Sequence, residues 1–537
     1  MLDEWKAVLV SEDQLAPVAL LHPIKFHLDW KSQVLTSGES HKEEGTEEGG
    51  VIHVPDAYSC AVAQSAAHSY LDPGRSQSTQ QEDVPVHVLC SSTTITMSAT
   101  VAMPVQDTSC ALDASDASVT VHALRTALAS MQQRLAMYSI TMDDALFVHL
   151  YVPNMDHFGA ANQVYAEFLP AVNPPARATV QLATTAATTL VVEIMFSATT
   201  CKSGSTENNT KKVLHVQSIS EWAPSCIGPY SQAVSYDGLV FFAGQIPLDP
   251  PTMRVLDNTN QDVVLATRRC VDSCQAVAIA VKTDLKVASL WWTVYYTRHD
   301  DKEAIQSVLL DDFLRDNSTA EEEEGEEEEE MGDDYLLPPP SMARYHGTAG
   351  TVRQCTPLIT FIELPQLPRA VSVEVQPVAW SFHGLRTLTD DTGTDSESSS
   401  GGEDDVIGWV NGLASEEESD HPSTPSSFLI TFLYAPRALF RGTAIVHDSS
   451  AVGVEHALHR LVALLTEKSA LEVAQDVVSI KIYYGPGFMD EDGVVDVVRM
   501  SVARILGNPR YACFIPVLSV SSTTTTAALA IELFAKK

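Results

Sequence analysis

The sequence lacks the features of several large protein classes. Its nine cysteines form no paired framework, and no stretch reaches the roughly 18 apolar residues that a membrane-spanning helix needs. The N-terminus carries acidic residues where a signal peptide has a basic start and an apolar core. These absences argue against a disulfide-stabilised secreted domain, and they predict a cytoplasmic protein with no membrane segment.

Basic residues are also scarce, because 33 Lys and Arg face 70 Asp and Glu, for a net charge of -37. Nucleic-acid binding needs clustered Lys and Arg, so we expect no nucleic-acid partner. Much of the acid is concentrated in runs, and between 321 and 334 eleven of fourteen residues are acidic. Such a run repels itself and stays solvated, which favours a spacer over a site for calcium or a basic protein.

The sequence also has few Cys and His residues at the spacing that metal ligands usually show. Cys270 and Cys274 are four residues apart on a predicted helix, which is half of a possible metal site. No second Cys or His pair follows at ligand spacing, and small cysteines are common on buried helix faces. We therefore predict no metal site.

One order of elements, β-β-α-β-α-β-β, recurs three times along the chain. In the first unit, Leu124, Leu128, Met131 and Leu135 fall on one face of a predicted helix. The second unit begins with a hairpin whose Asp237-Gly238 dipeptide suits the positive φ angles of a tight turn. The predicted divisions are a first segment 1–30, a connector 31–83, unit 1 at 84–200, unit 2 at 221–380 with an acidic insertion at 316–340, a disordered acidic and Ser-rich linker 381–426, and a divergent unit 3 at 427–537.

This order predicts an α+β fold. Two helices on one face of a mixed sheet give a two-layer sandwich, and about 110 residues suffice for each unit to bury a core of its own. The chain is thus expected to hold three such sandwiches in tandem.

Two sequence patterns resemble the RidA (YjgF-type) family. Residues 227–234, Ile-Gly-Pro-Tyr-Ser-Gln-Ala-Val, followed by Ala-Gly-Gln-Ile-Pro at 243–247, resemble the opening hairpin of that family. Unit 1 supplies the other part of the pattern, which is Phe158-x-x-x-Asn162-x-x-Tyr165, Pro175-Ala176-Arg177 and Val192-Glu193-Ile194. The resemblance implies chorismate-mutase-like sandwiches. RidA proteins are trimers with ligand sites between subunits, so it also implies an internal pseudo-trimer or a homo-oligomer.

The resemblance further implies a set of site residues for imine or enamine deamination. Arg177 is expected to grip a substrate carboxylate, and Glu193 to handle water and proton, with Glu374 as its counterpart in unit 2. Asn162, Tyr230 and Gly244 are expected to complete ligand binding across the interface of units 1 and 2. The alternative is that the Arg and Glu form only an interfacial ion pair.

The other two units depart from the family pattern. Unit 2 has Leu358-Ile359 where the arginine belongs, and Ala243 where deaminases often place a serine. Unit 3 offers Arg510 and Glu532, but the loop between them is longer than the pattern allows. At most one complete site is therefore expected. The family's older label, endoribonuclease, gains little support from a chain this acidic.

Tandem RidA-like units behind a separate domain resemble the eukaryotic diphthine–ammonia ligases. Residues 5–10 and 16–28 are similar to the segment that follows the ATP-binding domain of those proteins. The resemblance implies the last, ATP-dependent amidation step of diphthamide biosynthesis, with translation elongation factor 2 as partner. The Ser-Gly-Gly-x-Asp-Ser phosphate loop of the ligases does not occur here, so we expect no cofactor in this chain and ATP only in a ligase domain acting in trans. The alternatives are a 2-imino-acid deaminase and a non-catalytic binding or oligomerisation module.

Overall fold

The computed structural model describes most of the chain from residue 84 onwards, and all of these residues belong to one compact unit, 83–537. The predicted segments 1–30 and 31–83, the acidic insertion 316–340 and Arg510 lie outside the described residues. The described ranges are 84–102, 117–183, 189–198, 210–255, 262–314, 357–381, 410–415, 428–447, 450–485, 499, 501–502, 504–505, 512–522, 526–527 and 529–537.

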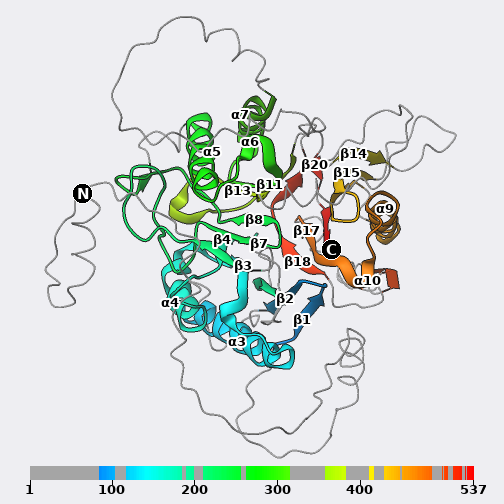
Figure 1. The fold of residues 1–537 in the computed structure, drawn as a ribbon, viewed down its shortest axis with the longest axis horizontal. Coiled ribbons are helices and arrows are strands. Elements are labelled where there is room, and N and C mark those ends of the chain that lie inside the picture. The colour runs from blue at the N-terminus through cyan, green and yellow to red at the C-terminus, as the bar shows by residue number, and fades with distance from the viewer. Residues whose placement is uncertain are drawn as a thin grey trace, which may run out of the picture. The chain divides into compact units, whose positions relative to one another are not determined.

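The first sheet is mixed and has the strand order β1-β2-β5-β3-β4. Its helices α3 and α4 lie together on the outer side of the sheet (Figure 1). Leu124, Leu128 and Met131 recur at helical spacing on α3 and are fully buried, so one face of this helix closes the core. The elements are β1 Val86–Cys90, β2 Thr94–Ala102, α3 Ala117–Leu135, β3 Ala145–Val152, α4 Phe158–Phe168, β4 Ala176–Gln181 and β5 Thr189–Ser197.

The second sheet repeats this order as β7-β8-β13-β11-β12 and is extended at both edges. The predicted hairpin turn is present, since Asp237 and Gly238 have φ angles of 50° and 79°. The elements are β6 Lys212–Leu214, β7 Ala233–Tyr236, β8 Leu239–Phe242, α5 Val263–Ala280, α6 Leu285–Ala288, β11 Ser289–Tyr296, α7 Lys302–Leu314, β12 Leu358–Glu363 and β13 Val373–Trp380, with β9 Leu248–Asp249 and β10 Arg254–Val255 paired apart.

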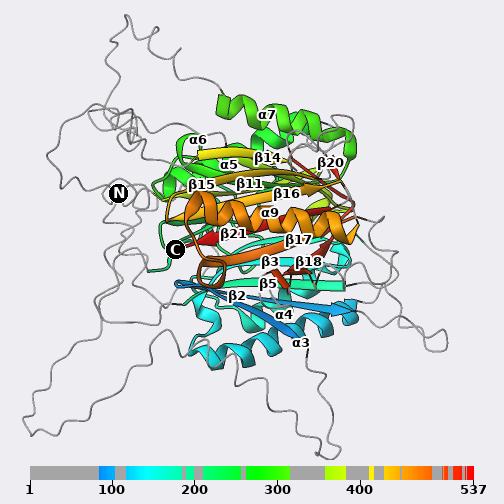
Figure 2. The ribbon, with the colours of Figure 1, turned by 90° about the vertical axis from the view of Figure 1, so that its right-hand side faces the viewer.

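The third sheet shows the same order again, β15-β16-β21-β17-β18, with β14 added at its edge. Figure 2 shows α9 lying across this sheet. The elements are β14 Val410–Ser415, β15 Phe428–Ala435, β16 Leu439–Val446, α9 Ala451–Ser469, α10 Val473–Asp476, β17 Val477–Tyr484, β18 Cys513–Pro516 and β21 Leu529–Lys536. The α+β sandwich fold predicted from the sequence is therefore present, and its strand order occurs three times.

Two details differ from the prediction. Residues 410–415 fall inside the predicted disordered linker, yet they form β14, which pairs with β15 through six residue pairs and covers its edge. The strand expected after the second helix of unit 3 is divided in two, because Pro516 has no amide hydrogen to continue the ladder. Beyond it the chain crosses over, and β19 (Ser519–Ser521), with β20 (Thr526–Ala527), extends the second sheet next to β12.

The ends of β4, β12 and β18 join the three sheets in a ring. The amide of Ala183 donates to the Pro516 carbonyl at 3.2 Å, and the amide of Leu518 donates to Glu363 at 2.9 Å. The amide of Gln181 donates to Gln366 at 3.3 Å and closes the ring between the first and second sheets. Equivalent strand ends thus meet in cyclic order, so the sheets have a pseudo-threefold arrangement, with the helices outside (Figure 1).

In the part of the chain that the structure describes, none of the helices combines the length and the apolar character needed to cross a membrane.

Candidate functional site

The first candidate site lies where β4 of the first sheet meets the chain around β7 and β8 of the second. Ala176 and Ser231 form a parallel bridge, and the Ser231 amide donates to the Pro175 carbonyl at 3.0 Å. The amide of Gly244 donates to the Arg177 carbonyl at 3.1 Å. These backbone bonds hold Arg177 at the boundary between the two sheets.

The Arg177 side chain is buried, with 4% of its surface exposed, among three aromatic rings. Its guanidinium carbon lies 4.6 Å from the ring centre of Tyr165, 5.2 Å from Tyr230 and 5.7 Å from Phe158. Burial lowers the pKa of Arg177, although Tyr165 and Tyr230 act in the opposite direction. A guanidinium stays protonated in proteins, so the site holds a fixed positive charge. Its Nη1 atom has no hydrogen-bond partner among the described residues.

Two glycines allow other groups to approach closely. A Cβ atom on Gly228 would lie 2.8 Å from Arg177 Nη2 and 3.3 Å from Asn162 Oδ1. A Cβ atom on Gly244 would lie 1.7 Å from Glu374 Oε1. A side chain at either position would displace the polar group beside it, so glycine at both positions keeps Arg177 and Glu374 in the arrangement seen here.

Glu374 on β13 supplies the carboxyl group of this site. It is 2% exposed, and its Oε2 atom has no hydrogen-bond partner among the described residues. Burial raises the pKa of Glu374 to about 8, and the positive charge of Arg177 offsets only part of that rise. The group is therefore protonated at neutral pH, so it can donate a hydrogen bond or a proton.

The structure brings together five of the six residues singled out from the sequence, and Glu193 is the exception. Glu193 on β5 pairs with His149 on β3, and Gln376 on β13 pairs with Thr293 on β11. His149 and Thr293 are each the fifth residue of equivalent strands, so Glu193 corresponds to Gln376 and not to Glu374. The sequence-based pairing of Glu193 with Glu374 was wrong by two residues, and among the described residues it is Glu374 that supplies the carboxyl group near Arg177.

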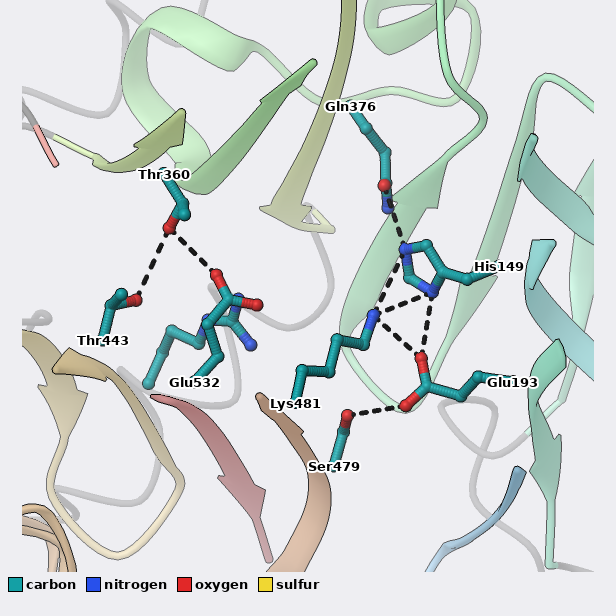
Figure 3. A network of polar contacts seen from close by, with 9 residues as sticks. His149, Glu193, Thr360, Gln376, Thr443, Ser479, Lys481 and Glu532 are labelled. Carbon is teal, nitrogen blue, oxygen red and sulfur yellow. Dashed lines mark hydrogen bonds and ion pairs between the residues drawn. The ribbon is translucent and has the colours of Figure 1, made fainter. Parts of the chain in front are cut away.

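Glu193 belongs instead to a buried polar network where the first and third sheets meet (Figure 3). Its Oε2 atom lies 2.8 Å from Lys481 Nζ and 3.1 Å from His149 Nδ1, and its Oε1 atom accepts from Ser479 at 3.0 Å. His149 Nε2 lies 3.1 Å from Gln376 Oε1, which ties in the second sheet. Burial by itself would raise the pKa of Glu193, but Lys481 and His149 outweigh it and hold that pKa at about 2. This network is fully paired.

A second ion pair fills the interface between the second and third sheets. Arg441 Nη2 lies 2.7 Å from Glu532, and Thr360 donates to the same carboxylate at 2.9 Å (Figure 3). The position equivalent to Arg177 on β12 is Ile359, as the sequence indicated. Both groups of the pair are buried, so this interface offers no unpaired charge to a ligand among the described residues.

A signal for the network was present in the sequence but was not used. His149 and Lys481 are the only residues with basic side chains in the strands ALFVHLYV and VVSIKIYY, and both are the fifth residue of their strand. Aligning the three units strand by strand would have placed His149, Thr293 and Lys481 together.

A surface pocket of about 370 Å³ has Phe158 in its wall, but Arg177 itself does not line it. The pocket is lined by Phe158, whose ring centre lies 5.7 Å from the guanidinium carbon of Arg177, and by Ile227, the neighbour of Gly228. Asp156, Gln366 and Arg369 form the polar part of its wall. Among the described residues no group of three or more His, Cys, Asp or Glu could hold a metal ion.

Comparison with known proteins shows the family of this chain. Residues 86–200 and 220–319 match the family model described as endoribonuclease L-PSP. A RutC family protein of Pyrococcus horikoshii is 33% identical over 95 residues, which cover 18% of this chain and 72% of that protein. The chain belongs to this RidA-like family.

Two further similarities concern a ligase and a solved structure. A diphthine–ammonia ligase of Schizosaccharomyces pombe is 30% identical over 155 residues, which cover 29% of this RidA-like chain and 24% of the ligase. The chain thus matches about a quarter of that ligase. A crystal structure of a Rid family protein from Yersinia pestis is 21% identical in sequence. The match covers 32% of this chain and 99% of that protein, with a TM-score of 0.23.

Proposed function

We propose that this chain acts in diphthamide biosynthesis on translation elongation factor 2, as the RidA-like region that accompanies an ATP-dependent diphthine–ammonia ligase. The 30% identity to such a ligase over 155 residues supports the proposal. In this arrangement the amide bond is made by an ATP-binding domain, with ATP as its cofactor. The described residues contribute a ligand site and a rigid scaffold.

The chemistry that we propose for the site is hydrolysis of a small imine that carries a carboxylate. The observation that carries this proposal is the pair of buried, unpartnered groups, Arg177 Nη1 and Glu374 Oε2, on the two sides of one interface. A guanidinium binds a carboxylate through two parallel N–H donors. A protonated Glu374 then donates its proton to the imine nitrogen. Water adds to the carbon and gives a proton back to the Glu374 carboxylate, and collapse of the resulting carbinolamine, with transfer of its hydroxyl proton to nitrogen, releases ketone and ammonia. Ammonia is the molecule that an ammonia ligase consumes.

The first test is hydrolysis of 2-iminobutyrate by the purified chain. Arg177→Ala should lower kcat/KM by roughly 10- to 100-fold, because it removes a charged pair of hydrogen bonds. Glu374→Gln should lower kcat by at least about 100-fold, because it removes the proton donor. Since the acid form is required, wild-type activity should fall as the pH rises through about 8, the pKa of Glu374.

Matched controls are available on the surface of the first sandwich. Arg125 and Glu167 form an exposed ion pair of the same residue types, so Arg125→Ala and Glu167→Gln should leave hydrolysis unchanged. Hydrolysis that survives both Arg177→Ala and Glu374→Gln would refute the proposed chemistry.

The second test concerns the link to amidation. Diphthine-bearing elongation factor 2, ATP and limiting ammonium are combined with a ligase domain and this chain, and the product is read as a mass shift. The chain should increase amide formation when an imine is supplied, and Arg177→Ala should abolish that increase. Equal amidation with and without the chain would refute the link while leaving imine hydrolysis standing.

A binding function without catalysis is the second candidate, and the Gln376–His149–Lys481 network favours it. That network and the Arg441–Glu532 pair show that two of the three interfaces are filled by internal pairs, as in a scaffold. Under this reading a carboxylate ligand binds with dependence on Arg177, and 2-iminobutyrate is not hydrolysed.

A further inference from the structure

The central strands of the three sheets carry a tyrosine at the same position. Tyr151, Tyr295 and Tyr483 are each the seventh residue of the equivalent strands β3, β11 and β17. All three are buried, with at most 1% of their surface exposed. They follow the positions of His149 and Lys481 by two residues, so each tyrosine points to the same face of its sheet as those polar groups.

The residue directly across from the tyrosine differs among the three sheets. On the second sheet it is Glu374, which pairs with Tyr295. On the first and third sheets the equivalent residues are Val191 and Ala530, whose side chains carry no polar group. Directly opposite residues of an antiparallel pair point to the same face, with Cβ atoms about 4.5–5.5 Å apart. The tyrosine of the second sheet therefore lies beside the carboxyl group of the candidate site.

Both residues of this pair have an unpartnered atom. Tyr295 Oη and Glu374 Oε2 are buried and have no hydrogen-bond partner among the described residues. Unsatisfied buried polar atoms are rare in folded proteins. Two of them on directly opposite residues indicate a role beyond packing.

The hydroxyl of Tyr295 remains a hydrogen-bond donor over the pH range in which Glu374 titrates. Burial raises the pKa of Tyr295 well above its usual value, and the negative charges of Glu374 and Glu532 act in the same direction. Burial raises the pKa of Glu374 only to about 8, because the positive charge of Arg177 acts against it. The proton that leaves this pair is therefore that of the carboxyl group, and the tyrosine stays protonated.

The other titratable groups near the pair come from several elements. Those that interact electrostatically with Glu374 are Arg177 on β4, Tyr230 before β7 and Cys270 on α5. Those that interact with Tyr295, besides Glu374, are Glu532 on β21, Tyr151 on β3 and Glu193 on β5. Burial raises the pKa values of Tyr230 and Cys270, so both are uncharged near pH 8. Arg177 thus supplies the charge that favours the carboxylate, and Tyr295 is the donor directly opposite it.

We propose that Tyr295 is a positioning residue for the hydrolysis proposed above, and that its hydroxyl donates a hydrogen bond to the Glu374 carboxylate formed when the imine is protonated. Tyr295 keeps its own proton, so the proton that Glu374 gives up still returns from the attacking water. The hydrogen bond stabilises a charge that exists only between these two transfers. This step rests on the proposed acid role of Glu374.

Replacement of Tyr295 by phenylalanine tests this proposal, because it removes the hydroxyl and keeps the ring. The Glu374 carboxylate loses a hydrogen bond, so its titration midpoint should move up by about one pH unit. The fall of 2-iminobutyrate hydrolysis at high pH should move up by the same amount. Below that fall, kcat should drop about tenfold because Glu374 is a weaker acid, and KM should stay nearly constant because Arg177 is intact.

Infrared difference spectroscopy of the full chain measures the titration of Glu374 without any turnover. Exposed carboxyl groups are ionised above about pH 6, so a protonated carboxyl band that remains there is assigned to Glu374 by its loss in Glu374→Gln. The matched control is Tyr296→Phe. Tyr296 is the next residue of β11, lies opposite Val373 and points to the other face of the sheet. Its replacement should change neither the band nor the pH profile.

The outcomes separate this inference from the proposed chemistry. A Glu374 titration that is unchanged or moves down in Tyr295→Phe overturns the inference, whatever the imine assay shows. A titration that moves up while kcat and the pH profile stay constant overturns the positioning role. If the titration moves up in Tyr295→Phe and not in Tyr296→Phe, the hydrogen bond is supported even where the wild type hydrolyses no imine, and then the proposed chemistry alone is refuted.

Discussion

Replacement of Lys481 by methionine tests the buried network at the meeting point of the three sheets. The Lys481 side chain is 8% exposed and its Nζ atom lies 2.8 Å from Glu193 Oε2. Methionine is similar in volume, so the substitution removes the charge and leaves little cavity. The carboxylate of Glu193 would remain buried without its cation, which costs about 3–5 kcal/mol. The fall in the pKa of Glu193 from 4.5 to about 2 corresponds to about 3 kcal/mol, which agrees.

The pH dependence of this loss has a definite sign. In the wild type the pKa of Glu193 is lower in the folded state, so its stabilisation is present above about pH 4.5 and is lost toward pH 2. Without Lys481, burial should instead raise the pKa of Glu193. Its contribution would then be fully present only below about pH 4.5 and would be lost as the pH rises. The deficit of the variant should therefore grow from pH 5 to pH 8.

Urea unfolding at pH 5, 6, 7 and 8 measures this deficit directly. The matched control is the double variant Lys481→Met with Glu193→Gln, in which no buried charge remains unpaired. It should recover most of the lost stability and show little pH dependence relative to the wild type. A Lys481→Met variant that loses less than about 1 kcal/mol at pH 7, or that Glu193→Gln fails to rescue, would refute the reasoning.

Two further substitutions test other parts of the interior. Gly244→Ala should destabilise the chain by about 1–3 kcal/mol and abolish hydrolysis, because the new Cβ would displace the Glu374 carboxyl group. The control is Gly159→Ala, whose Cβ meets nothing within 4 Å and which should change neither stability nor hydrolysis. Urea unfolding and the imine assay measure the two effects. Arg441→Met should lower the free energy of unfolding by about 3–5 kcal/mol, because it leaves the buried Glu532 unpaired. Urea unfolding measures this loss, and adding Glu532→Gln should restore most of the stability. A loss below about 1 kcal/mol would contradict the role of this pair.

The repeated sandwich could be predicted from the sequence because its signals are local. The helical spacing of Leu124, Leu128 and Met131 and the turn at Asp237-Gly238 each report on a few neighbouring residues. The crossing of the chain after Pro516 into the second sheet could not be predicted in this way. It depends on which edge is open in space, and β12 offers that edge from a distant part of the chain.

The site shows the same division between local and long-range information. Arg177 and the segment with Tyr230 and Gly244 could be found from short patterns, each within one stretch of chain. The error over Glu193 arose because the segments Val192-Glu193-Ile194 and Val373-Glu374-Val375 are alike as text. Only the pairing of each β strand with its neighbour fixes the register, and a shift of two residues keeps the same face while moving the side chain along the strand.

The three interfaces are built from equivalent strands, yet among the described residues only the first holds an ionisable pair, Arg177 and Glu374, with unpartnered side-chain atoms. At the first, Arg177 and Glu374 come from different sheets, and the buried atoms Arg177 Nη1 and Glu374 Oε2 have no hydrogen-bond partner among the described residues. At the other two, Lys481 and Arg441 supply the cation that neutralises Glu193 and Glu532 within the chain. An identical trimer could not make this distinction, because every substitution would appear at all three interfaces. Linking the units in one chain allows two interfaces to hold the assembly while the third is left for a ligand.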